Sequence, residues 1–302
     1  MSADQDKPLL GIMLMLVAMM MVPLLDMFAK LLSHDYPVLQ VTWARFAFHT
    51  LWLLPLLLWQ RLRWWCLPVK LGYQLIRSLL LIVTTLSFFI AIRDNPIPNA
   101  LTLLFVSPLV VAMVAPVWLG ESFDWQRGIA VLCGFLGILL VLQPTTNQFQ
   151  YSLIPALVAG ISYACYIMIT RKLSHSVAPL LTLFYTAVVG FLILSPLAVS
   201  VWVKPDLQAV VMMAAMGFFA AVGHFMIIQA CEYATASQLS PFNYFEIIGA
   251  VVISYLVFGY WPTIEVWGGV LVVSLSGFYI SWREMRMVAK ATLVDNFRAD
   301  KL

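Results

Sequence analysis

The chain carries little charge for its length. Of its 302 residues only 10% are charged, whereas 63% are hydrophobic, and a soluble domain has about 25% charged residues. A soluble fold of this composition would have to expose much of its apolar surface to water. A bilayer removes that difficulty, because lipid acts as an apolar solvent. The shortage of charge therefore excludes an ordinary soluble protein and predicts a polytopic membrane protein.

Common enzyme motifs are missing as well. The sequence has no GxxxxGK[ST] phosphate-binding loop, no HExxH zinc motif and no GxSxG nucleophile turn. Its four histidines and four cysteines are scattered, without the spacing of a metal site or a CxxC motif. We therefore expect no enzyme, no catalytic residue, no cofactor and no metal. The small net charge of +3 gives no hint of nucleic-acid binding.

What the chain does contain is a series of apolar runs, each near the roughly 20 residues that a transmembrane helix needs. Short polar segments rich in Pro, Asn and Asp separate them. The first run is too long for the core of a signal peptide, which has about 7–15 apolar residues. We predict an all-α membrane protein with ten spans, at 9–32, 38–59, 72–92, 97–119, 128–143, 152–170, 177–200, 207–230, 236–258 and 264–282.

Lysine and arginine are distributed unevenly between the two sides of the predicted membrane. With the N-terminus inside, the outer loops carry only Arg93 and Lys204. Cytoplasmic loops are enriched in these residues, so both termini are expected to be cytoplasmic. The absence of an N-x-S/T sequon favours a bacterial inner membrane. The inner segments and the tail carry Lys7, Arg61, Arg63, Lys70, Arg127, Arg171, Lys172, Arg283, Arg286, Lys290, Arg298 and Lys301.

The two halves of the sequence resemble each other. Residues 27–34 align with residues 168–175, and Leu119-Gly120 aligns with Phe258-Gly259. Each half contains five predicted helices, and an odd number makes the second copy inverted in the membrane. We predict a first repeat at 1–147, an inverted second repeat at 148–284, and a basic tail at 285–302 that is disordered or lies on the inner leaflet. Chance similarity between apolar segments is the alternative.

Two segments carry a resemblance to a known family. They are LLFVSPLVVAMVAPVWLGE at Leu103–Glu121 and LSPFNYFEIIGAVVISYLVFG at Leu239–Gly259. The chain resembles the drug/metabolite transporter superfamily, in particular its EamA-type ten-helix carriers, whose fourth and ninth helices carry a Pro-containing motif and end at a Leu-Gly-Glu-like turn. It departs from the pattern at Ile247 and Tyr260. The resemblance implies a basket of helices around a central cavity, with the fifth and tenth helices peripheral.

Inserting an ionisable residue at the centre of a transmembrane helix costs about 2.5–3.5 kcal/mol of free energy. We therefore expect each such residue within a span to have a functional or structural partner. At a rise of 1.5 Å per residue, Asp26 and Arg45 come to similar depths on adjacent helices, which predicts an ion pair in the cavity. Alternatively, Asp26 pairs with Lys30 and Arg45 only holds two helices together. Arg77 lies near the inner end of its span, and we expect it to snorkel to the cytoplasmic surface.

Glu246 lies near the middle of the ninth predicted span, where neither end can stabilise its charge. Pro241, Asn243 and Tyr244 precede it, so we expect a broken backbone there. A carboxyl group in this setting suits proton binding or contact with a cationic part of a substrate. In the repeat alignment Glu246 corresponds to Ser107. We predict that these positions face each other at the substrate site; a buried structural hydrogen bond is the alternative.

Other polar and aromatic residues within the spans are candidates for the cavity wall. Arg45 and His49 lie on one face of the second span, by their spacing of four residues. A histidine in the eighth span and aromatics in the second and sixth could complete the wall. These further candidates are Trp43, Tyr163, Tyr166 and His224.

The sequence therefore favours a secondary carrier for a small amphipathic metabolite, such as an amino acid, a nucleoside-like compound including S-adenosylmethionine, or a flavin, substrates that the resemblance also implies. Its expected partners are that substrate and the lipid bilayer, with no nucleic acid, and the chain is expected to be a monomer or weak homodimer. A membrane pore or lipid scramblase is the alternative, and a membrane-embedded enzyme a more distant one.

Overall fold

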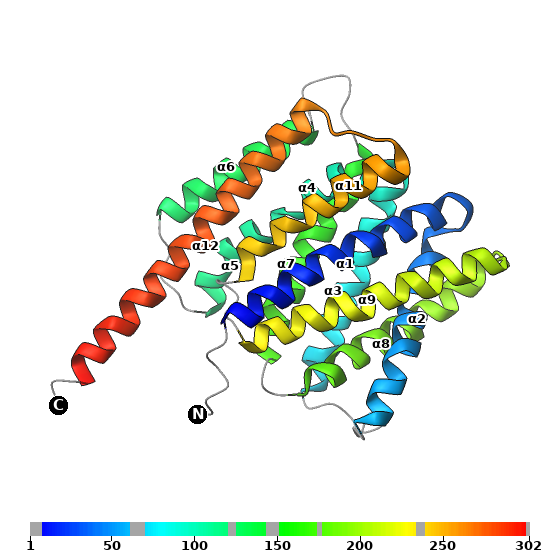
Figure 1. The fold of residues 1–302 in the computed structure, drawn as a ribbon, viewed down its shortest axis with the longest axis horizontal. Coiled ribbons are helices and arrows are strands. Elements are labelled where there is room, and N and C mark those ends of the chain that lie inside the picture. Colours follow the sequence, from blue (N-terminus) through cyan, green and yellow to red (C-terminus); the bar gives the residue numbers. More distant parts are fainter. Residues whose placement is uncertain are drawn as a thin grey trace.

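The computed structural model describes residues 8–60, 70–119, 125–142, 151–173, 177–233 and 239–299. All regular structure in these ranges is helical, as predicted, and each predicted span contains helix (Figure 1). The helices are α1 (Pro8–Asp35), α2 (Val38–Trp59), α3 (Leu71–Asp94), α4 (Ile97–Leu104), α5 (Val106–Leu119), α6 (Trp125–Leu142), η1 (Tyr151–Leu153), α7 (Ile154–Leu173), α8 (Pro179–Ser200), α9 (Leu207–Tyr233), η2 (Ser240–Phe245), α11 (Glu246–Phe258) and α12 (Ile264–Ala299).

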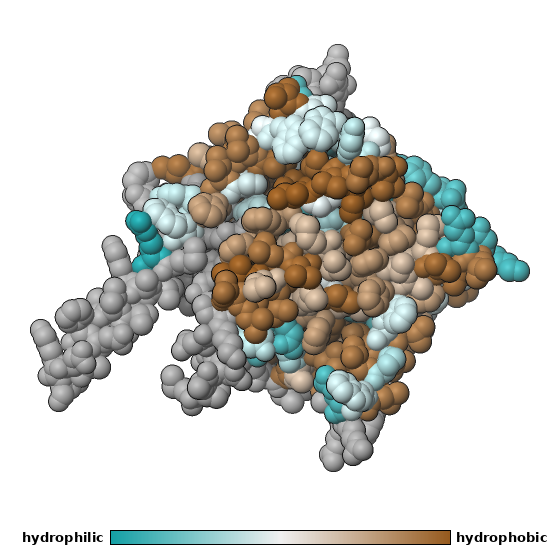
Figure 2. Space-filling model, in the orientation of Figure 1, coloured by the Kyte–Doolittle hydropathy of each residue, from teal (hydrophilic) through white to brown (hydrophobic). Residues whose placement is uncertain are grey.

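Six helices in the described ranges are long and apolar enough to cross a membrane. They are the first three predicted spans and the sixth, seventh and eighth. Large apolar side chains remain exposed along them, among them Leu58 and Leu192. Figure 2 shows the result: apolar residues cover the middle of the face in view, and hydrophilic ones gather at its right edge, where α1 turns into α2 and where α9 begins. Such a surface matches a lipid environment.

The fourth and ninth predicted spans are both interrupted. The fourth consists of α4 and α5, which are separated at Phe105. Pro108 lacks an N–H and so leaves the carbonyl of Leu104 without its helical donor, which places the break one turn before the proline. The ninth begins as the 3-10 helix η2, with Pro241 in its first turn, and becomes α-helical at Glu246. In the repeat alignment, the start of α5 at Val106 and the start of α11 at Glu246 differ by one residue.

Helices of the first half pack mainly against helices of the second. α1 packs along α9, α3 along α7, and α2 against both α8 and α9. α6 and α12 pack along each other and form one edge of the bundle (Figure 1), as the resemblance implies. In that contact a Cβ built on Gly137 would lie 3.1 Å from the carbonyl oxygen of Gly269, so small residues allow the close approach.

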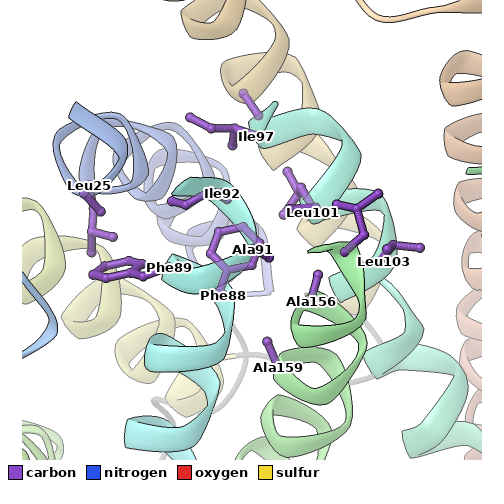
Figure 3. Close-up of a cluster of buried hydrophobic side chains, with 14 of the residues drawn as sticks. Leu25, Phe88, Phe89, Ala91, Ile92, Ile97, Leu101, Leu103, Ala156 and Ala159 are labelled. Atoms are coloured by element: carbon purple, nitrogen blue, oxygen red, sulfur yellow. The ribbon is translucent and has the colours of Figure 1, made fainter. Parts of the chain in front are cut away.

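The largest buried core lies where α1, α3, α4 and α7 meet (Figure 3). Leu25 of α1 lies beside the ring of Phe89, while Ala156 and Ala159 let α7 approach α4. This core fixes the helices that surround the charged residues described next.

Candidate functional site

A cavity lies at the centre of the bundle. Its space between protein atoms is about 570 Å³, counting the part open to solvent. Seven helices from both halves of the chain contribute to its wall. The lining residues are Met19, Val22, Leu25, Asp26, Arg45, Leu81, Thr84, Thr85, Phe88, Phe89, Leu104, Tyr163, His224, Ile227 and Glu246.

Five of the residues singled out from the sequence line this central cavity: Asp26, Arg45, Tyr163, His224 and Glu246. Each comes from a different helix, α1, α2, α7, α9 and α11. Asp26 and Arg45 are almost fully buried, and Glu246 is partly buried at the start of α11. The helix packing therefore gathers charges of both signs around one space.

Arg45 is anchored by two other helices. Its Nη1 donates to Thr85 Oγ1 on α3 at 2.7 Å, and its Nη2 lies 2.7 Å from His224 Nε2 on α9. Arginine has only donors, so His224 Nε2 accepts and this ring carries its proton on Nδ1. The arginine Nε has no partner in the described part of the chain. The Nε–H therefore remains without an acceptor in these residues.

The predicted ion pair between Asp26 and Arg45 is wrong. No nitrogen–oxygen distance within 4.0 Å joins them in the described residues, where the only acid–base pair of this kind is Arg93–Asp94. The physical reason is that the guanidinium is instead held by hydrogen bonds with Thr85 and His224. Asp26 and Arg45 therefore face the cavity as separate charges.

The alternative pairing of Asp26 with Lys30 does not form either. Lys30 Nζ donates to the carbonyl oxygens of Ile92, at 2.5 Å, and Asn95, at 2.7 Å. These carbonyls lie at the C-terminal end of α3, where helix carbonyls lack intrahelical donors and attract cations. Lys30 thus joins α1 to the end of α3.

Arg77 corrects another prediction. Its side chain is fully buried instead of reaching the cytoplasmic surface. Its Nη2 donates to Thr186 Oγ1 on α8 at 2.7 Å, and its guanidinium lies 5.0 Å from the ring centroid of Tyr166 on α7. Thr186 offers a hydroxyl group and Tyr166 the face of its ring, so the guanidinium is stabilised inside the bundle without reaching water at the cytoplasmic surface.

His49 and Tyr166 stand just behind the cavity wall. The ring of His49 stacks 6.3 Å from that of His224, and Tyr166 stacks 5.8 Å from Tyr163. Both His49 nitrogens are buried without a partner in the described residues. These two residues back the wall without lining it.

The other candidates lie elsewhere. Trp43 Nε1 donates to Ser195 Oγ at 2.9 Å and packs at the junction of α2 with α8. Tyr244 points toward Gly277 of α12, away from the cavity, and neither Ser107 nor Asn243 is among the lining residues. The helix breaks nevertheless meet, because the rings of Phe105 and Tyr244 are 5.0 Å apart.

Residues of α3 were missed by sequence reasoning. Thr84, Thr85, Phe88 and Phe89 form one side of the cavity. Their signal was the pair of hydroxyl residues in an otherwise apolar span, but such residues commonly bond to their own helix, as Thr84 does to the carbonyl of Leu80.

The relatives that this chain resembles in sequence are named as transporters. S-adenosylmethionine uptake transporters of Rickettsia bellii and Rickettsia prowazekii are each 24% identical, over 88% and 92% of this chain and 91% and 95% of theirs. A riboflavin transporter of Vibrio cholerae is 26% identical over 93% of this chain and 96% of its own. A solved crystal structure has the same fold, with a TM-score of 0.65 at 12% identity, covering 93% of this chain and 97% of that one.

The strongest finding is at the level of the family. The model of the EamA-like transporter family matches residues 9–143 and, separately, residues 150–282. Together these matches take in every helix that lines the central cavity. The members are membrane transporters and not enzymes, and this chain belongs to the EamA-like transporter family.

Proposed function

We propose that this protein is a secondary carrier that moves a small organic metabolite across a bacterial inner membrane by alternating access, coupled to protons or by exchange. The observation that carries the proposal is the central cavity. Asp26, Arg45 and Glu246 line it together, without an ion pair within 4.0 Å among them in the described residues. Buried charges without an opposite charge close by are costly, and a substrate with complementary groups would compensate them.

Two features support alternating access. The family model matches each half of the chain, and the breaks in the fourth and ninth spans fall at equivalent places. Two inverted repeats, at 1–147 and 148–284, could exchange conformations and thereby open the cavity to one side and then to the other. The packing of each half against the other makes such an exchange a rearrangement of the whole bundle. It requires no second copy of the chain.

The wall also favours one kind of substrate. The carboxyl groups of Asp26 and Glu246 suit a cationic group, and the free Nε of Arg45 suits an anionic one. Phe88, Phe89 and Tyr163 offer flat apolar surface. A nucleoside-like compound with an amino-acid group matches all three features, so relatives named for S-adenosylmethionine uptake are a better guide than those named for riboflavin.

Flux into proteoliposomes tests the proposal, with S-adenosylmethionine and riboflavin as labelled substrates. Loss of a hydrogen bond to a charged group costs about 1.5–3 kcal/mol, and about 1.36 kcal/mol is tenfold in rate. We therefore expect Glu246→Gln to lower flux about tenfold or more. The matched control is Glu265→Gln, which changes an exposed carboxylate at the start of α12. Near-normal flux with an unchanged pH profile in Glu246→Gln would contradict the role of this residue.

Thermal unfolding with the same compounds separates binding from transport. A ligand at one hundred times its dissociation constant stabilises the folded state by about 2.7 kcal/mol. We expect the true substrate to raise the melting temperature of wild type and of Glu265→Gln, but less that of Glu246→Gln. Substrate-independent leakage of ions or lipid, without any such stabilisation, would instead favour a pore or scramblase.

A further inference from the structure

A second pocket opens at one end of the bundle, away from the central cavity. We call it the end pocket. Its space between protein atoms is about 880 Å³, open solvent included. It lies where α1, α3 and α11 end and where the chain turns toward α4 and α12. Its lining residues are Lys30, His34, Arg93, Asp94, Asn95, Pro96, Ser254, Phe258 and Tyr260.

The end pocket and the central cavity share three helices. On α1, Lys30 of the end pocket follows Asp26 of the central cavity by one turn, on the same face. On α11, Ser254 comes about two turns after Glu246. α3 likewise contributes Phe88 to one space and Arg93 to the other. The two spaces therefore follow each other along the same helices.

The end pocket offers donors that nothing in the described chain uses. The Lys30 ammonium has three N–H groups, and its two hydrogen bonds to α3 carbonyls leave one over. The Ser254 hydroxyl is 1% exposed and has no hydrogen-bond partner in the described residues. Buried hydroxyls are normally satisfied. Lys30 on α1 and Ser254 on α11 both line this pocket. Each therefore has an N–H or O–H group that can donate to a bound ligand.

The charge of the pocket is positive. Lys30 and Arg93 are cations. Asp94 is the one carboxylate among the lining residues, and its Oδ1 lies 3.8 Å from Arg93 Nε. The charge of Asp94 is thus offset by its neighbour, which leaves that of Lys30 in excess.

The local fold keeps these groups in place. Gly259 ends α11 in the left-handed conformation, with φ at 63°, and the N–H of Tyr260 returns to the carbonyl of Ser254 at 2.9 Å. The Tyr260 hydroxyl donates to Asn99 Oδ1 at 3.0 Å. Burial raises the pKa of that hydroxyl above its usual value, so Tyr260 adds no negative charge.

We propose that the end pocket is a binding site for a small organic anion that carries a carboxylate, separate from the central cavity. Lys30 and Ser254 are its buried donors, and Arg93 is the exposed cation at its rim. If the proposed function holds, the pocket is where the acidic group of a substrate rests before it passes the buried residues Ala29, Ile92 and Ala250. Anion binding itself does not depend on transport.

Chemical labelling in nanodiscs tests the site on the full chain. The four native cysteines are replaced by serine, and Ser254→Cys is introduced. Two methanethiosulfonates of similar size, one anionic and one cationic, then react with it, and each rate is divided by its rate with a free thiol. A positive cleft raises the local concentration of anions, so we expect the anionic reagent to react about tenfold faster. Succinate at constant ionic strength should slow it.

Two further variants show whether the lining charges cause the preference. Arg93→Gln and Lys30→Gln should each reduce the rate ratio several-fold; Arg93 is half exposed, so its variant folds even if Lys30→Gln does not. The control is Trp261→Cys, an exposed position beside the pocket, which should show no protection by succinate. Equal rates for the two reagents, no reaction of Ser254→Cys, or no protection by succinate would overturn the proposal. Failed flux with intact protection would contradict only the proposed function.

Discussion

The buried cations of this bundle are held by neutral groups. Lys30 binds backbone carbonyls, Arg45 a threonine and a histidine, and Arg77 a threonine beside a tyrosine ring. Within the described residues none of them has a carboxylate within 4.0 Å. Acceptors without charge fix the position of a cation and leave its charge uncompensated. Under the proposed function, Asp26 and Glu246 are then available to a substrate or to protons.

Arg45→Lys tests this arrangement at a single residue. Lysine keeps the charge but loses the fork that reaches Thr85 and His224 together. We expect the KM for a substrate with a carboxylate to rise about tenfold, and that for its neutral ester to rise less, in flux measurements on proteoliposomes. Thr85→Val is the control, because it removes one anchor and keeps the guanidinium. An equal loss for acid and ester would show that Arg45 only holds helices together.

Sequence reasoning found the acidic residues more reliably than their partners. Asp26 and Glu246 stand out because an ionisable residue within an apolar span is costly, and both line the central cavity. The position of Arg77 near a span end suggested the surface, but position along one helix says nothing about Thr186 on another. The ion pair of Asp26 with Arg45 failed for the same reason.

The elements themselves follow closely from the sequence, except at their interruptions. The ends of α2, α3 and α9 lie within three residues of the predicted spans. The break in the ninth span was expected from its proline and polar residues, whereas the fourth was predicted as one helix and is divided at Phe105. The run around Pro108 is apolar except for Ser107, so hydropathy alone gave no sign of the missing hydrogen bond.

Close helix contact makes Gly217→Ala a prediction at this scale. A Cβ at Gly217 of α9 would collide with the Cβ of Phe48 and lie 2.8 Å from the backbone nitrogen of His49 on α2. Overpacking costs about 1–3 kcal/mol, so we expect a lower melting temperature in detergent. Gly72→Ala is the matched control, because a Cβ there has nothing within 4 Å and alanine favours helix. Equal melting temperatures for the two variants would contradict the contact.

At the scale of the whole molecule, the pairing of helices could not be predicted. Lipid and neighbouring helices are equally apolar, so hydropathy does not distinguish the face that packs from the face that meets lipid. The structure places α1 against α9 and α3 against α7, which the order of the spans does not reveal. The start of α1 and the end of α12 lie on the same side of the bundle (Figure 1).

That placement makes the topology testable. Because cytoplasmic segments are rich in lysine and arginine, we expect both termini inside. A green fluorescent protein fused to the C-terminus should fluoresce, and an alkaline phosphatase fused there should be inactive. Phosphatase fused within the loop before Lys204 should be active. The reverse pattern would invert the molecule in the membrane and place the end pocket in the cytoplasm.

The length of α12 has a consequence for imaging. Its 36 residues extend about 54 Å at 1.5 Å per residue, whereas the hydrocarbon core of a bilayer is about 30 Å thick. The helix therefore continues well beyond the membrane. A chain of 34.0 kDa offers few features outside a detergent micelle for aligning particles in cryo-electron microscopy. A helical protein fused in register after Ala299 would extend α12 as one rigid rod and supply such a fiducial.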